Sequence, residues 1–285
     1  MTTAPETAAE QALKPNRVIC SSITLRHLPL ERALGVIADL GFTGIDLGAL
    51  PGVCDHVPYQ LTSLAVRDVA DTVRRSGLTV RSVNADVGDL NRPLDAQQSA
   101  DRHEHVQRLI ELCQAVGSTG LVLPNGALQH EPIVSLDADL ALVADQLVSI
   151  QQDCVAEGLE LWVEAPHFFR LCYNLDRAAA LARLLPDDLG IICDVSHIVA
   201  SGSTPRQFIH DFGDRIRHVH LRDAEPGYIH HSIGNGHVDF ADAVTALAEI
   251  GYSGKLSLEL ETRDITNEER PDAALRAGRY ISSLL

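Results

Sequence analysis

Four stretches of the chain place an acidic or imidazole side chain where an apolar run ends. Glu164 follows LWV, Asp194 follows GIIC, His220 closes HVH and Glu259 follows LSL. Burying each of these charges alone would be costly, and a bound cation would supply the counter-ion. Carboxylate oxygens together with an imidazole nitrogen suit a hard or borderline divalent ion such as Mn²⁺, Mg²⁺, Co²⁺ or Zn²⁺.

Two neighbouring residues compete for the same role. His218 stands two residues before His220, and Glu261 stands two residues after Glu259. Side chains two apart in a strand point to the same face, so the spacing alone does not choose between the members of each pair.

Further polar residues near these strand ends could contact a substrate. His167 and Arg170, in EAPHFFR, would supply an imidazole base and a cationic anchor for an oxyanion or an acidic group. His197 is tied to Asp194 by a DxxH spacing, and Asn84, with Asp86, closes another apolar run. In the segment YIHHSIGNGHVDF we expect a loop that covers the substrate, with His230, His231 and His237 on it and sharp turns at Gly234 and Gly236.

The predicted elements that would position these residues alternate between strands and helices. Short apolar runs indicate buried strands, and apolar residues at helical spacing, often closed by glycine, follow them. The predicted strands are 17–24, 44–50, 78–88, 121–126, 159–166, 189–197, 216–224 and 255–262. The predicted helices are 30–42, 61–77, 97–117, 137–158, 175–185, 205–213, 239–251 and 270–285.

Eight alternating strand and helix units predict a parallel sheet, and in a chain of 285 residues they favour a closed (β/α)8 barrel over an open sheet. No GxGxxG follows the first strand, which argues against a dinucleotide-binding domain. We expect residues 1–16 to form a flexible N-terminal arm and residues 17–285 to form a single barrel domain. Barrels of this kind carry their chemistry at the C-terminal ends of the strands, where the four candidate ligands would meet.

Composition narrows the classes of partner. The hydrophobic content of 45% is enough for a large core, and the formal charge of -16 disfavours nucleic acid and anionic membrane surfaces. Six scattered cysteines without paired spacing indicate buried, reduced thiols. The first residues lack the pattern of a signal peptide and no apolar run is long enough to span a membrane, so we expect a cytoplasmic protein.

The chain resembles the xylose isomerase-like TIM barrel superfamily, in the sugar phosphate isomerase/epimerase branch that includes ketose 3-epimerases and inosose dehydratase-like proteins. The resemblance runs from residue 17 onward. It rests on DVSH (194–197), HLRD (220–223), GNGHVDF (234–240) and GYSGKLSLE (251–259). It implies one divalent metal, Mn²⁺ first, held by Glu164, Asp194, His220 and Glu259 in preference to His218 and Glu261. Glu164, Glu259 and His167 would move protons, and substrate would be contacted by His197, Arg170, Asn84, Arg222 and His237.

The expected activity is isomerisation or epimerisation of a small carbohydrate by proton removal next to a carbonyl, through a metal-stabilised enediolate. One departure qualifies this. Ketose 3-epimerases carry a glutamate six residues after the strand-five ligand, where this chain has Arg170. A lyase that dehydrates or β-eliminates keto-sugars, keto-glycosides or inososes is therefore the alternative. More remote are an endonuclease IV-like nuclease and a non-catalytic binding barrel. The resemblance also implies a homo-oligomer.

Overall fold

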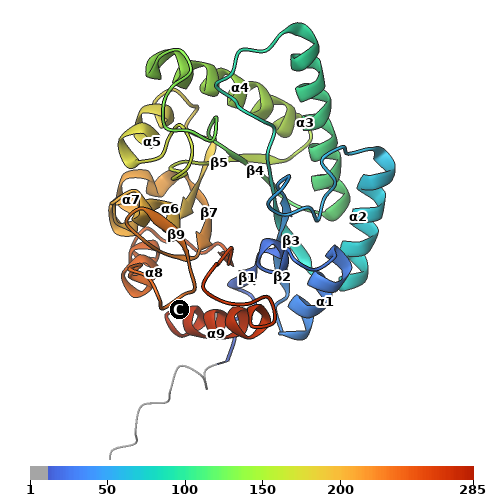
Figure 1. Cartoon of the computed structure of the whole chain (residues 1–285), viewed down its shortest axis with the longest axis vertical. Coiled ribbons are helices and arrows are strands. Elements are labelled where there is room, and N and C mark those ends of the chain that lie inside the picture. The colour runs from blue at the N-terminus through green and yellow to red at the C-terminus, as the bar shows by residue number, and fades with distance from the viewer. Residues whose placement is uncertain (1–11) are drawn as a thin grey trace, which may run out of the picture.

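The computed structural model describes residues 12–285. Eight parallel strands form one sheet that curls into a nearly closed ring, with the helices outside it (Figure 1). The sheet order is β1 (Val18–Cys20), β10 (Leu256–Leu258), β7 (Ile216–Leu221), β6 (Gly190–Asp194), β5 (Glu160–Glu164), β4 (Gly120–Pro124), β3 (Thr79–Ala85) and β2 (Gly44–Ala49). The predicted barrel is confirmed.

Between the two end strands of the sheet, a hydrogen bond to a side chain takes the place of the backbone hydrogen bonds that join the other strands. β1 and β2 are the ends of the hydrogen-bonded order, yet they lie beside each other. The backbone N–H of Gly48 in β2 donates to the hydroxyl of Ser22, 2.9 Å away, in the 3-10 helix η1 (Ser22–Leu25) that follows β1. Polar contacts of single side chains thus bridge the seam, because Thr43 Oγ1, just before β2, also donates to the carbonyl of Pro15, just before β1.

Capping residues set the ends of several helices. Thr62 caps α2 (Ser63–Ser76), which ends at Gly77 with φ of 73°, and Asp95 and Gln98 form a capping box on α3 (Ala96–Val116). The remaining helices are α1 (Leu30–Asp39), α4 (Leu136–Ala156), α5 (Leu175–Ala182), α6 (Val195–Ala200), α7 (Pro205–Phe212), α8 (Phe240–Glu249) and α9 (Arg270–Ser283), with a 3-10 turn η2 (Gly213–Arg215).

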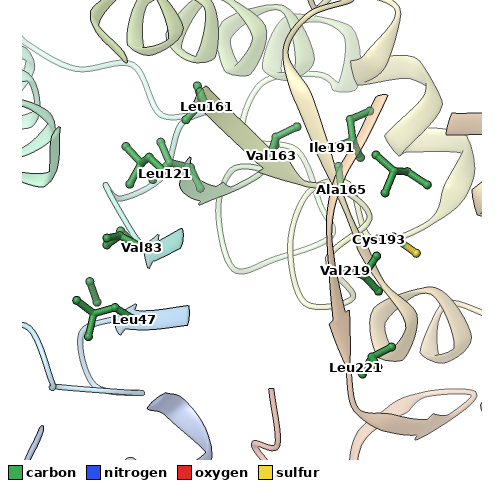
Figure 2. Packing of buried hydrophobic residues seen from close by; sticks show 14 of the residues in the cluster. Leu47, Val83, Leu121, Leu161, Val163, Ala165, Ile191, Cys193, Val219 and Leu221 are labelled. Atoms are coloured by element: carbon green, nitrogen blue, oxygen red, sulfur yellow. The ribbon is translucent and has the colours of Figure 1, made fainter. Parts of the chain in front are cut away.

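Alternation along the strands separates two cores. Leu161, Val163, Ile191 and Cys193 belong to the large apolar cluster between sheet and helices, part of which Figure 2 shows. Their neighbours Val122, Trp162 and Ile192 form a small separate cluster. Gly120 and Gly190 leave room for it, because a Cβ at either position would overlap the Trp162 ring.

Several predicted strand bounds were wrong. The predicted strand 17–24 ends at Cys20, before η1, and the predicted strand 255–262 ends at Leu258. The predicted strand 189–197 ends at Asp194, because one oxygen of that carboxylate accepts the backbone N–H groups of Ser196 and His197 and so caps α6. The predicted strand 216–224 stops at Leu221, and a separate antiparallel hairpin follows, formed by β8 (Asp223–Glu225) and β9 (Tyr228–His231) around a turn at Gly227 with φ of 86°.

At the N-terminus, residues 1–11 of the predicted arm lie outside the described residues. The end of that predicted arm, residues 12–16, touches the barrel. The backbone N–H of Lys14 donates to Ser282 Oγ at 2.9 Å, and Pro15 accepts a hydrogen bond from Thr43. All six cysteines are free and buried, as predicted.

Candidate metal centre and active site

The four predicted ligands meet at the C-terminal end of the barrel. Glu164 is the last residue of β5, Asp194 the last of β6, His220 lies in β7, and Glu259 directly follows β10. All four are buried, and each offers one ligand atom within 4.8 Å of every other. Neighbouring parallel strands thus bring together side chains that are up to 95 positions apart in the sequence (259 minus 164).

The distances between these atoms are too long for direct hydrogen bonds. His220 Nδ1 lies 3.6 Å from Glu164 Oε1, 4.0 Å from Asp194 Oδ2 and 3.5 Å from Glu259 Oε2. Three of the four atoms, Glu164 Oε1, Asp194 Oδ2 and His220 Nδ1, are buried without any hydrogen-bond partner. Unpartnered buried polar atoms are costly, and a divalent cation among them would satisfy all of them. The residues present therefore fit a metal ion.

Other contacts fix the orientation of two of the three carboxylates. Asp194 Oδ1 accepts the backbone N–H groups of Ser196 at 2.7 Å and His197 at 3.1 Å. Glu259 Oε1 accepts from the Asn84 amide at 2.9 Å. One oxygen of Asp194 and one of Glu259 are thus held, and the other oxygen of each faces the centre of the cluster.

A fourth carboxylate, that of Asp46, lies on the far side of the His220 imidazole from the cluster. Asp46, in β2, places Oδ2 2.7 Å from His218 Nε2 and 3.4 Å from His220 Nε2, and its Oδ1 accepts from the Ser82 hydroxyl at 2.7 Å. His218 therefore lies in a deeper layer of the barrel, as predicted. Asp46 was not among the residues predicted for the site. Its signal was an acidic residue within the apolar run GIDLGA.

The crowding of charges shifts the pKa values in this cluster. Burial raises the pKa of Glu259 to about 8 and that of Glu164 above its ordinary value, with further contributions from neighbouring carboxylates. Burial alone would lower the pKa of His220, but Glu259, Asp46 and Glu164 together raise it well above its ordinary value. The cluster thus favours bound positive charge.

The cluster lies beneath a cavity of about 240 Å³. Seven residues predicted for the site line this cavity: Asn84, Glu164, His167, Arg170, His197, Arg222 and Glu259. His230, on β9, lines it as well, in keeping with its predicted place on a segment that covers the substrate, and so does Phe169, to which sequence reasoning assigned no site role. His237 is not brought there. Its side chain is 65% exposed and its Nε2 lies 3.9 Å from Glu225.

Two imidazoles stack above the carboxylates. The rings of His167 and His197 have centroids 4.0 Å apart. The backbone N–H of Phe168 donates to His197 Nδ1 at 2.9 Å, so a neutral His197 carries its proton on Nε2. That nitrogen lies 3.9 Å from both Glu164 Oε1 and Asp194 Oδ2.

Both rings are held neutral. Burial lowers the pKa values of His167 and His197 well below their ordinary values, and neighbouring positive charges, Arg222 first for His197, act in the same direction. His167 Nε2 lies 3.9 Å from Glu164 Oε2, and its Nδ1 is buried without a partner. His197 can therefore donate a hydrogen bond, and His167 can accept a proton.

The two arginines of the cavity are largely engaged by protein groups. Arg170 donates to the carbonyl of Gly126 at 2.6 Å and forms an ion pair with Asp86. Arg222 donates to Ser196 Oγ at 3.0 Å and lies 3.4 Å from Glu261. Glu261, which also pairs with Arg26 at 2.7 Å, lies at the rim and not in the four-residue cluster.

Comparisons with known proteins agree with this geometry. A family model described as "Xylose isomerase-like TIM barrel" matches residues 34–283. The inosose dehydratase of Lacticaseibacillus casei is 28% identical over 148 residues, which cover 44% of this chain and 49% of that protein. The chain thus matches about half the length of that relative. The 3-dehydro-D-guloside 4-epimerase of Escherichia coli (strain K12) is 22% identical over 233 residues, covering 78% of this chain and 84% of that protein.

Solved structures share the fold. The IOLI protein, determined with a zinc atom, superimposes with a TM-score of 0.76 at 19% identity, covering 94% of this chain and 99% of that one. A D-allulose 3-epimerase from Methylomonas sp. gives a TM-score of 0.77 at 18% identity, covering 96% and 99%. Within residues 12–285, no helix combines the length and the apolar character needed to cross a membrane.

Proposed function

The chain belongs to the xylose isomerase-like TIM barrel family, and from this membership we propose that it is a divalent-metal-dependent enzyme that isomerises or epimerises a keto-sugar. The observation that carries the proposal is the convergence of Glu164 Oε1, Asp194 Oδ2 and His220 Nδ1, all buried and unpartnered, beside Glu259. Three carboxylates and one imidazole suit Mn²⁺, with Mg²⁺, Co²⁺ and Zn²⁺ as alternatives.

When bound, the cation would supply Lewis-acid polarisation of a substrate carbonyl and its neighbouring hydroxyl. The chain's own residues would then handle the protons. Glu164, Glu259 and the neutral His167, all of which line the cavity, are the groups that would take a proton from the carbon next to the carbonyl and return it. His197 would donate its Nε2–H to a substrate oxygen.

A lyase is the second candidate. Arg170 stands where ketose 3-epimerases carry a glutamate. Because Arg170 forms an ion pair with Asp86, the Asp86 carboxylate is not free to bind sugar hydroxyls. Proton removal followed by loss of a β-substituent would give dehydration or β-elimination. Inosose dehydratases are among the relatives that the chain matches, which favours this candidate.

The test is exchange of substrate hydrogen with solvent deuterium. Metal-loaded protein is incubated in D₂O with a panel of ketoses, keto-glycosides and inososes, and the products are identified by NMR and mass spectrometry. Deuterium at the carbon next to the carbonyl supports the shared first step, and the product separates epimerase from lyase. An absence of both exchange and elimination product across the panel would contradict both candidates.

A further inference from the structure

Part of the mouth of the active-site cavity is apolar, although its floor is polar. Three large apolar side chains that line the cavity are exposed: Val53 at 39%, Leu128 at 67% and Phe169 at 39%. Leu50, Pro51 and Ile229 lie beside them in the lining. We call Leu50, Pro51, Val53, Leu128, Phe169 and Ile229 the apolar rim.

The apolar rim is assembled from separate parts of the chain. Val53 belongs to the segment between β2 and α2, Leu128 to the segment between β4 and α4, and Phe169 to the segment between β5 and α5. Ile229 comes from the hairpin strand β9. Loops distant in sequence therefore each place an apolar side chain at one opening. Exposed apolar groups gathered around a pocket are typical of ligand contact, whereas single ones scattered over a surface are ordinary.

Phe169 is held in position at this rim. Its ring stacks on that of His230 with centroids 6.1 Å apart and meets the ring of His197 edge-on at 6.4 Å. His230 is fixed in turn, because its Nδ1 lies 2.8 Å from the carbonyl oxygen of Glu261. The aromatic ring is thus pre-positioned above the imidazole that faces the metal cluster, with part of its surface free.

The two zones of the cavity call for different chemistry. On the floor, carboxylate, imidazole and amide groups match the oxygens of a keto-sugar. A free sugar carries hydroxyls over its whole surface, and the side chains of the apolar rim have no hydrogen-bonding group to meet them. Two charged residues that follow β10, Glu261 and Arg263, also line the cavity. Glu261 is already paired with Arg26, whose Nη1 also donates to the carbonyl of Val53.

We propose that the substrate is a keto-sugar that carries an apolar substituent, preferably aromatic, with the sugar on the floor and the substituent against the apolar rim. This inference rests on the proposed function and specifies its substrate class. The substituent stacks on the free part of the Phe169 ring and is flanked by Leu128 and Val53.

Binding of a matched pair of ligands tests the proposal. Isothermal titration calorimetry on the Mn²⁺-loaded full chain compares methyl and phenyl 3-keto-β-D-glucosides, which differ only in the substituent. We expect the phenyl compound to bind about tenfold or more tightly. Phe169→Ala and, as a second variant, Leu128→Ala should each reduce this ratio several-fold. Leu184→Ala, at a 50% exposed leucine away from the cavity, is the matched control and should leave the ratio unchanged.

Equal affinity for the two ligands would overturn the inference, and so would binding of neither. A second copy of the chain is the rival occupant of the apolar rim. If Phe169→Ala breaks an oligomer in analytical ultracentrifugation while the wild-type protein shows no phenyl preference, the rim is an interface and the inference fails. Deuterium exchange is scored separately, so a phenyl preference without exchange would support the substrate class and contradict the proposed chemistry.

Discussion

One carboxylate oxygen of Asp46, Oδ2, lies between two imidazoles: it is 2.7 Å from His218 Nε2 and 3.4 Å from His220 Nε2. His220 turns its other nitrogen, Nδ1, toward Glu164, Asp194 and Glu259. A carboxylate behind a ligating imidazole sets its tautomer and its orientation, and loss of such a partner typically weakens metal binding by about 10- to 100-fold.

Asp46→Asn should therefore weaken Mn²⁺ binding by about that factor while the four candidate ligands remain. Competition with a chelator of known affinity measures the change, and circular dichroism confirms that the variant is folded. Asp86→Asn is a suitable control, because Asp86 is also an acid near the cavity but pairs with Arg170 outside the cluster. If the Mn²⁺ affinity of Asp46→Asn equals that of the wild-type protein, Asp46 does not orient His220 for metal binding.

Replacing His167 should separate chemistry from metal binding. The imidazole lies 3.9 Å from Glu164 and is not a member of the four-residue cluster, so His167→Asn should keep its metal. Its kcat should fall by about 10²- to 10⁴-fold if the ring moves a proton. Steady-state kinetics and elemental analysis of the same sample check both statements. Full activity in the variant would exclude His167 as a proton carrier.

The glycines beside Trp162 should tolerate no side chain. A Cβ at Gly190 would overlap the buried indole ring and the Arg217 side chain, so Gly190→Ala should lower the free energy of unfolding by about 1–3 kcal/mol. Gly35→Ala is the matched control, because nothing lies within 4 Å of the added Cβ in α1. That substitution should stabilise the protein by about 0.5–1 kcal/mol. Urea unfolding of both variants is the measurement, and equal effects would contradict the packing described here.

A buried aspartate should make stability depend on pH. Asp139 accepts hydrogen bonds from the Asn91 amide and from the backbone N–H groups of Ile133 and Val134, at 2.7, 2.7 and 3.0 Å. Burial alone would raise its pKa, but these donors lower it below the ordinary value of 3.8. The ionised form is the one the fold stabilises, so its contribution is complete above the unfolded-state pKa and is lost as the pH falls through the folded-state pKa.

Asp139→Asn should accordingly cost about 1–3 kcal/mol of unfolding free energy at neutral pH. The difference from the wild-type protein should begin to shrink below about pH 4 and disappear only as the pH falls through the lowered folded-state pKa, where the wild-type side chain also becomes neutral. Chemical unfolding of both proteins from pH 3 to 8 measures this. A difference that does not vary with pH would show that the charge of Asp139 is not what stabilises the segment.

Much of the site follows from local sequence signals. Alternation of strands and helices predicts the barrel, and the barrel places every strand's C-terminal end on one face. For this reason Glu164, Asp194, His220 and Glu259 could be grouped from sequence. The extent of the strand containing Asp194 could not be read from apolar character alone, because Asp194 starts a helix by capping it and carries His197 onto that helix.

Other features depend on contacts between distant residues. Arg170 and Asp86 are 84 positions apart in the sequence, so their ion pair could not be predicted from the sequence. The hairpin of β8 and β9 places His230 beside Phe169 and leaves His237 in solvent, although all the histidines of that segment look alike in sequence. Such outcomes are decided by tertiary packing and not by local propensity.

Metal content is the most direct test of the four-residue site. Elemental analysis after exhaustive dialysis compares the wild-type protein with Glu259→Gln and with its matched control Glu261→Gln, two residues along the same segment but outside the cluster. We predict about one divalent ion per chain in the wild-type protein and in Glu261→Gln, and little in Glu259→Gln. A wild-type protein that binds no divalent ion even when one is supplied, or an ion lost from Glu261→Gln and kept in Glu259→Gln, would contradict the site described here.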